Sequence, residues 1–300
     1  MLGRGVLTHR SDLPAEDDGR ITLKMLAYHP ATARHVARKL CQRLIADEPP
    51  ESVVEAAAAT FLQYRLASNQ IAHTLRTILL SPEFKDPALW GKKTKRPFEA
   101  VVSAMRATGC NHTFRQDDST NPSSDTTSSF LSEYNGAGQP LFRWRSPDGY
   151  PDTRSFWQGS NTMVRLWRTI DWLTDRDAAT ASMRVLPIID LTLANLQGDP
   201  TARQVVEFWL EWIMGFAPDG GWTGPPGTAI SSAPTALGEA ALRFFTQIYP
   251  GEPSDRTIWP ADDMPIARSA LEVNSGGYDW NTRLRGLVAL ILWSPNFLQR

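Results

Sequence analysis

The chain has 300 residues, and its 31 basic and 32 acidic side chains give a net charge of −1. A balanced charge without a basic block is not typical of a dedicated nucleic-acid binder, which needs clustered Lys and Arg to displace phosphate counterions. Two cysteines, Cys41 and Cys110, exclude a disulfide-rich scaffold, and no apolar run reaches the roughly 18–20 residues of a membrane span. Ten of the eleven tryptophans lie after residue 140.

Helical patterns fill the first third of the chain. Residues 21–47 read as helix, with Pro30 at a first helical position and His29 before it as a capping neighbour. Apolar residues then recur at three- and four-residue intervals, as on the buried face of a helix. Three further helices follow with short connections, at residues 51–66, 69–81 and 97–109. Short connections favour an antiparallel bundle.

The composition changes after residue 110. Residues 111–129 hold almost nothing to bury, which predicts a mobile polar loop. Residues 138–160 are predicted to be irregular, because Pro147-Asp148-Gly149 is turn chemistry. Helical spacing returns in the back half, at about residues 130–135, 160–170, 201–216, 235–249, 262–273 and 281–293.

No strict two-residue alternation extends over several segments, so the predicted fold class is all-α: a multi-helix bundle with long irregular loops and no substantial sheet. The predicted organisation has four parts. They are an N-terminal extension (1–20), a first helical subdomain (21–110), the mobile polar loop (111–129) and a second helical subdomain with Trp-rich loops (130–300).

One pattern occurs twice. An apolar helix end runs into Ser-Pro-x-Phe both at residues 81–84 and at residues 294–297. Two interpretations stay open: a shared helix-stop signal, since the residue before proline leaves the α region, or descent of two subdomains from one ancestral unit. In both, the phenylalanines are packing residues.

Four stretches occur in an order and spacing that match a known pattern. They are residues 26–40 (LAYHPATARHVARKL), 95–106 (KRPFEAVVSAMR), 138–151 (GQPLFRWRSPDGYP) and 294–297 (SPNF). Together they resemble the bacterial family catalogued as domain of unknown function 1800, and the resemblance covers nearly the whole chain.

The resemblance has implications of its own. Family members are usually longer, and their front half carries an Asn-Glu-Asn-x-x-Arg-Glu-x-x-Glu-type motif that this chain lacks. The chain therefore resembles the back portion of a longer member. Because members are commonly exported, the resemblance implies a periplasmic or cell-surface location. The chain itself begins without a signal peptide, and any export signal would lie in the absent half.

The residues offer no metal or cofactor motif. None of the five histidines pairs at ligand spacing, and neither a phosphate-binding Gly-rich loop nor a nucleophile elbow is present. Hence no metal site and no cofactor are predicted. Cys41 is expected to be a buried small hydrophobe, and a disulfide between Cys41 and Cys110 stays open.

The aromatic loops carry the functional hypotheses. Aromatic faces stack on sugar rings and polar side chains bind hydroxyls, so a glycan or peptide groove is chemically reasonable on loops held by a rigid scaffold. The alternative interpretation is that these aromatics fasten an irregular loop to the core. The predicted ligand-binding residues are Trp144, Tyr150, Trp157, Arg165 and Trp222, and the weak catalytic candidates are Asp148 and Asp152.

Three functions follow as hypotheses. The first is a binding or assembly module for a polymer or partner protein. The second is a hydrolase of an extracellular polysaccharide, with Asp148 and Asp152 as its carboxylates and part of its site in the absent half. The third is an inactive fragment of a split gene. The expected partners are a glycan, a protein or an upstream-encoded N-terminal half, and not nucleic acid.

Overall fold

A computed structural model describes residues 14–110, 126–174, 185–215, 237–246, 265–273 and 279–299. The described chain forms two compact units. One unit holds the described residues up to Lys93 together with Asp152–Arg154, and the other holds Thr94–Pro151 and the described residues from Ser155 onward. Each unit has its own core, so each is described by itself.

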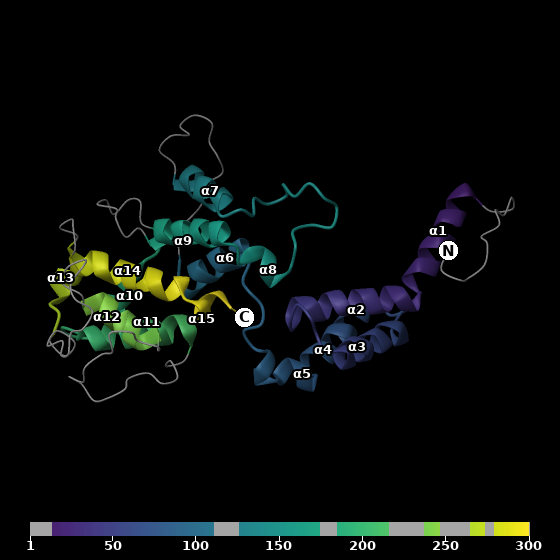
Figure 1. The fold of residues 1–300 in the computed structure, drawn as a ribbon, viewed down its shortest axis with the longest axis horizontal. Helices are drawn as coiled ribbons and strands as arrows, with labels where there is room; N and C mark the ends of the chain where they lie inside the picture. Colours follow the sequence, from purple (N-terminus) through teal and green to yellow (C-terminus); the bar gives the residue numbers. More distant parts are fainter. Residues whose placement is uncertain are drawn as a thin grey trace. The chain divides into compact units, whose positions relative to one another are not determined.

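The first unit is built on three helices that lie side by side, α2, α3 and α4 (Figure 1). Its core is made of small and branched side chains, among them Ala37, Val54 and Ile78, none of them exposed. The helices of this unit are α1 (Ala15–Ala27), α2 (Pro30–Leu44), α3 (Glu51–Gln63), α4 (Gln70–Leu79), α5 (Pro82–Lys85) and the 3₁₀ turn η1 (Pro87–Leu89).

The segment 21–47, expected as one helix, is divided at Tyr28 and His29. Proline has no N–H to donate and pushes the preceding residue out of the α region, so α1 ends and α2 begins at Pro30. The His29 Nδ1 atom accepts a hydrogen bond from the Ala31 N–H at 3.1 Å. This confirms the predicted capping role of His29.

The second unit surrounds a central helix, α14. The helices of this unit are α6 (Pro97–Ala107), α7 (Thr126–Gly136), α8 (Arg154–Trp157), α9 (Ser160–Thr174), α10 (Ile188–Asn195), α11 (Ala202–Met214), α12 (Leu237–Thr246), α13 (Arg268–Glu272), α14 (Trp280–Trp293) and α15 (Pro295–Leu298). The first residue of α8, Arg154, belongs to the first unit, and the rest of that helix belongs to the second. In Figure 1, α14 runs between α9 on one side and α11 and α12 on the other. Such a helix must be apolar around most of its circumference.

The sequence of α14 meets that requirement. Its residues from Leu284 to Ala289 are all buried, and Asp279 caps its first turn by accepting from the Thr282 N–H at 2.8 Å. The one long polar side chain that is fully buried here, Arg285, donates to the Asn281 side chain and to the Thr174 carbonyl at the end of α9. A backbone carbonyl at the C-terminus of α9, which has no partner within its own helix, thereby accepts a hydrogen bond inside the core.

The boundary between the units differs from the predicted boundary at residue 110. Helix α6, which we assigned to the first helical subdomain, packs against α7 and α9 of the second unit. Its Ala100, Val101 and Ala104 are buried in that unit's core. The division falls at Lys93–Thr94, ahead of the helix. Periodicity locates a helix but does not say which core its apolar face joins.

Both Ser-Pro-x-Phe stretches form the same corner. Ser81 and Ser294 have extended backbones, and each hydroxyl accepts from the N–H of the phenylalanine three residues later. The stretch therefore stops one helix and caps another of a single turn, α5 or α15. The corner recurs once in each unit, which leaves both interpretations of the repeat in place.

The all-α prediction is confirmed. Within the described ranges there is no strand, only two isolated bridges, Thr94 with Gln299 and Thr201 with Pro265. The helix predicted to follow residue 201 begins with a reciprocal cap between Thr201 and Gln204 and ends at Gly215, whose φ of +75° suits a residue without a side chain. The mobile polar loop predicted at 111–129 falls mostly outside the described residues.

Candidate functional site

The irregular segment between α7 and α8 is held in place by two aromatic side chains, one from the segment itself and one from α8. The Tyr150 hydroxyl donates to the Pro140 carbonyl at 2.7 Å, and the Trp157 indole N–H donates to the Pro151 carbonyl at 2.7 Å. A buried or half-buried Tyr or Trp needs such a partner for its polar atom. Both side chains therefore fix the course of the loop.

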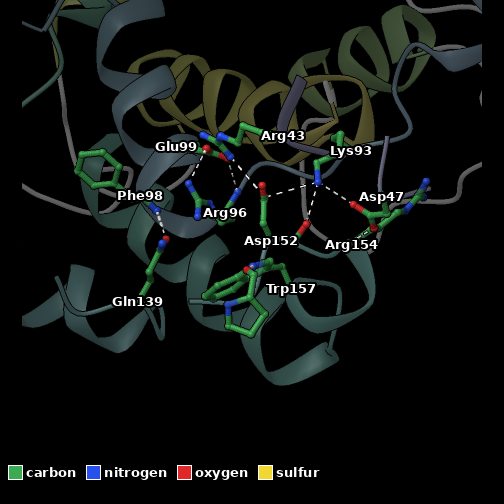
Figure 2. Close-up of polar contacts among 11 residues, drawn as sticks. Arg43, Asp47, Lys93, Arg96, Phe98, Glu99, Gln139, Asp152, Arg154 and Trp157 are labelled. Carbon is green, nitrogen blue, oxygen red and sulfur yellow. Dashed lines mark hydrogen bonds and ion pairs between the residues drawn. The ribbon is translucent and has the colours of Figure 1, made fainter. Parts of the chain in front are cut away.

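The beginning of the loop is anchored in the core. The Gln139 side chain accepts from the Phe98 N–H at 2.9 Å, as Figure 2 shows, and the Gln139 carbonyl accepts from the Tyr134 hydroxyl at 2.7 Å. Burial, reinforced by the nearby Tyr150, raises the pKa of Tyr134 to about 12, so its hydroxyl remains a donor at neutral pH. The loop starts from a rigid base.

Four aromatic rings gather where the loop meets α8. The Trp144 and Tyr150 centroids lie 4.8 Å apart, and so do those of Phe156 and Trp157. Trp144 also meets Phe156 edge-on at 6.0 Å, and Tyr150 lies 6.0 Å from Trp157. We call these four residues the aromatic cluster. It brings together three of the five predicted ligand-binding residues.

The cluster has a buried side and an exposed side. Trp157 is 2% exposed, whereas Trp144 and Phe156 keep 36% and 45% of their surface in solvent. Beyond them Phe142 is completely exposed, and its φ of +60° is a backbone conformation that a bulky residue rarely adopts. An exposed phenylalanine in that conformation adds no packing to the fold.

The two candidate carboxylates belong to different units. Asp148 lies on the exposed loop, where its Oδ1 accepts from the Trp144 indole N–H at 3.3 Å. Asp152 belongs to the first unit and has cationic partners there. The separation between these carboxylates, on which a glycosidase assignment depends, is therefore not fixed by either unit.

Asp152 takes part in a network centred on Lys93 (Figure 2). The Lys93 ammonium donates to Asp47 Oδ1 at 2.7 Å and to the Asp152 carbonyl at 2.8 Å, and it lies 3.5 Å from Asp152 Oδ1. Arg43 approaches the same carboxylate at 3.4 Å, and the Arg154 N–H donates to Asp47 Oδ2 at 2.6 Å. We call this the Lys93 network.

The Lys93 side chain is 3% exposed, so it depends on these oxygens to compensate for the water it has lost. Asp47 and Asp152 are 27% and 30% exposed and supply the counter-charge. Lys93 and Arg43 balance the two aspartates. The contacts fasten Asp152–Arg154 to the first unit, so Asp152 has a structural role whatever else it does.

Arg165 lines a separate hollow in the second unit, between α7 and α9. Its Nε donates to Asn161 Oδ1 at 3.1 Å and its Nη1 to the Gly136 carbonyl at 3.2 Å. The cavity holds about 380 Å³ and is lined by Glu133, Gly136, Asn161, Val164, Arg165 and Arg168. We call it the α7–α9 cavity, and its volume lies within the range of roughly 300–1,000 Å³ typical of small-molecule sites.

The remaining predictions concern residues or features elsewhere. Trp222 lies outside the described residues. Cys41 and Cys110 are not joined in a disulfide: Cys41 is buried in the first unit, and Cys110 is half-buried in the second, where its thiol donates to the Val185 carbonyl at 3.5 Å. Across the described part of the chain, no three His, Cys, Asp or Glu side chains are grouped as metal ligands would be, and no helix is long and apolar enough to cross a membrane.

The sequence matches one family model, described as "Protein of unknown function (DUF1800)", over residues 1–299. The chain belongs to the DUF1800 family. No curated protein and no solved structure gave a significant match to this DUF1800 chain. That it corresponds to the back portion of longer members stays a prediction.

Two features of the DUF1800 chain were not predicted from its sequence, for different reasons. The α7–α9 cavity could have been suspected in part, because Asn161, Arg165 and Arg168 recur at the spacing of one helix face. That spacing does not reveal which residues of α7 face them. The Lys93 network had no local signal, because its contacts join residues 46 and 59 positions apart.

Proposed function

We propose that this DUF1800 chain is a binding module that recognises a polysaccharide on the exposed side of the aromatic cluster. The observation that carries the proposal is the gathering of the four rings of the aromatic cluster, in which Trp144 and Phe156 are exposed and Trp157 is buried beneath them. The apolar face of a sugar ring packs well against a flat aromatic ring, which offers a large contact area with little side-chain entropy to lose.

The anchoring of the loop supports this function. Tyr150 and Trp157 hold the loop through hydrogen bonds, so the exposed ring of Trp144 is already oriented before a ligand arrives. A surface fixed in advance loses less conformational entropy on binding. The completely exposed Phe142 extends the apolar surface, and Arg143 and Arg145 beside it supply hydrogen-bond donors.

The test is the retention of the purified chain by a panel of insoluble polysaccharides, followed by titration with soluble oligosaccharides of the type retained. Trp144→Ala is expected to weaken binding by about tenfold or more, the effect of losing an aromatic anchor. Trp212→Ala is the matched control, because Trp212 on α11 is 43% exposed and outside the aromatic cluster. The variant should bind as the wild type does.

Two results would contradict the proposal. The first is a folded protein that no polysaccharide retains. The second is a Trp144→Ala variant with unchanged affinity. If a protein partner is recovered instead, and Trp144→Ala abolishes its capture, the aromatic cluster is an assembly surface and the polysaccharide assignment is wrong.

A polysaccharide hydrolase that uses Asp148 and Asp152 is the alternative. It has less support, because Asp152 is held by Lys93 and Arg43. Release of reducing sugar by the wild type and its loss in Asp148→Asn would establish turnover. An inactive fragment of a split gene is the third candidate. It predicts poor solubility through exposed apolar surface, and a soluble, cooperatively unfolding monomer would argue against it.

An exported, envelope-associated location is part of the proposal and is supported by the family resemblance. Fractionation of the producing bacterium tests it directly. Recovery of the endogenous protein in the periplasmic or cell-surface fraction is the expected result. Recovery only in the cytoplasm would contradict the location while leaving the binding measurement intact.

A further inference from the structure

We propose that the α7–α9 cavity binds a carboxylate-bearing sugar unit, so that the recognised polysaccharide is an acidic one built with uronic acids. This inference rests on the proposed function and names its ligand class. It starts from the charges around the cavity.

The cavity is lined by three charged side chains, and none of them forms an ion pair with another described residue. Arg165 donates only to the neutral oxygens of Asn161 and Gly136, while Arg168 and Glu133 have no polar partner from their side chains among the described residues. Charged groups that face one hollow without neutralising one another leave their binding capacity for a ligand.

The two guanidinium groups select an anion. Arg165 and Arg168 are three positions apart on α9, so both point from one face of the helix to the cavity. Arg165 is already oriented by its bonds to Asn161 and Gly136, and part of its donor fork stays available. A planar guanidinium matches a carboxylate with two parallel hydrogen bonds.

Glu133 favours a uronate over a phosphorylated sugar. Its carboxylate comes from α7, on the opposite wall, and repels the dense negative charge of a phosphate. A uronic acid carries a single negative charge together with hydroxyl groups, and those hydroxyls can donate to Glu133. Asn161 offers amide atoms to the same ring, and Val164 supplies an apolar contact.

The experiment is an NMR titration of the 15N-labelled chain with glucuronate, glucose and glucose 6-phosphate, followed by titration with uronate and neutral oligosaccharides. Glucuronate should shift the amide signals of Gly136 and Asn161, and glucose should not. Arg168→Ala is expected to weaken glucuronate binding by about tenfold, the loss of a charge-assisted hydrogen bond. Arg76→Ala, an exposed arginine on α4 of the other unit, is the control and should change nothing.

The outcomes separate this inference from the proposed function. If glucuronate still shifts the Gly136 and Asn161 amide signals in the Trp144→Ala variant, the anion site lies in the cavity and does not depend on the aromatic cluster. Equal affinity for uronate and neutral oligosaccharides, an unaffected Arg168→Ala variant or tighter binding of glucose 6-phosphate overturns the inference and leaves the aromatic surface standing. Absence of all sugar binding overturns both.

Discussion

Replacing Lys93 by methionine removes the centre of the Lys93 network while keeping a side chain of similar length. The ammonium is withdrawn from Asp47 Oδ1 at 2.7 Å and from the Asp152 carbonyl at 2.8 Å. No other described lysine or arginine approaches Asp47 within ion-pair distance. The methionine still fills the buried space, so the measured change reports chiefly on the lost charge.

The expected loss is about 2–3 kcal/mol of the free energy of unfolding of the first unit. Removing one partner of a fully buried ion pair destabilises by about 3–5 kcal/mol, because the other charge is left without a partner. Two features reduce the effect here. The carboxylates of Asp47 and Asp152 are 27% and 30% exposed, so water can reach them, and each keeps another donor, the Arg154 N–H or Arg43.

The assay is urea unfolding of the full chain, with the labelling rate of the buried Cys41 thiol as a probe that belongs to the first unit. Lys85→Met, an exposed lysine of α5 in the same unit, is the control and should lie within about 0.5 kcal/mol of the wild type. Adding Asp47→Asn to Lys93→Met should recover part of the lost stability, because it removes the carboxylate that is left without a cation. A Lys93→Met variant as stable as Lys85→Met would refute the reasoning.

Three further predictions concern single side chains. Burial raises the pKa of the Cys41 thiol to about 11. In a Cys110→Ser variant, alkylation of Cys41 at pH 7.5 should therefore proceed only as fast as the first unit opens. Rapid labelling of the folded protein would contradict this. Ser294→Ala removes the cap of α15 and should lower the free energy of unfolding by about 1 kcal/mol in thermal unfolding. Ser294→Thr keeps a capping hydroxyl and should lose less. Equal losses in the two variants would exclude capping as the cause. The hydrogen bond from the Ser52 hydroxyl lowers the pKa of Glu83 below its ordinary value. The stabilisation from this bond is therefore present above the ordinary carboxyl pKa and is lost as the pH falls through the lowered pKa. NMR titration of Ser52→Ala should find the Glu83 pKa moved upward, with the stability difference from wild type shrinking in acid; an unmoved pKa would rule out the hydrogen bond as its cause.

Local rules predicted most of the helices. Pro30 with His29, Pro97 and Thr201 each marked a helix start that the structure confirms, because caps and first-turn prolines act within four residues of themselves. Helix α10 was missed. It is short, eight residues, and Asp190 and Thr192 alternate with its leucines, so the sequence shows little of the three- and four-residue periodicity by which helices are recognised.

Long-range relations were the part that the sequence could not supply. Trp144, Tyr150 and Trp157 were singled out by residue type within one stretch of 14 positions, and their gathering followed from that closeness. The pairing of Asp152 with Lys93 was invisible, since a carboxylate in a sequence does not reveal whether its partner is a substrate or a lysine 59 residues away.

The attachment of Asp152–Arg154 to the first unit has a consequence for taking the molecule apart. The chain passes between the units at three peptide bonds, after Lys93, Pro151 and Arg154. A protease that cuts once at any of these places frees neither piece. A gene cut after Lys93 leaves Asp47 in the shorter product but deprives it of Asp152, whose carbonyl and carboxylate are the other oxygens beside the buried ammonium group. To produce the first unit by itself, residues Asp152–Arg154 must therefore be joined to the fragment that ends at Lys93, for example through a short engineered linker.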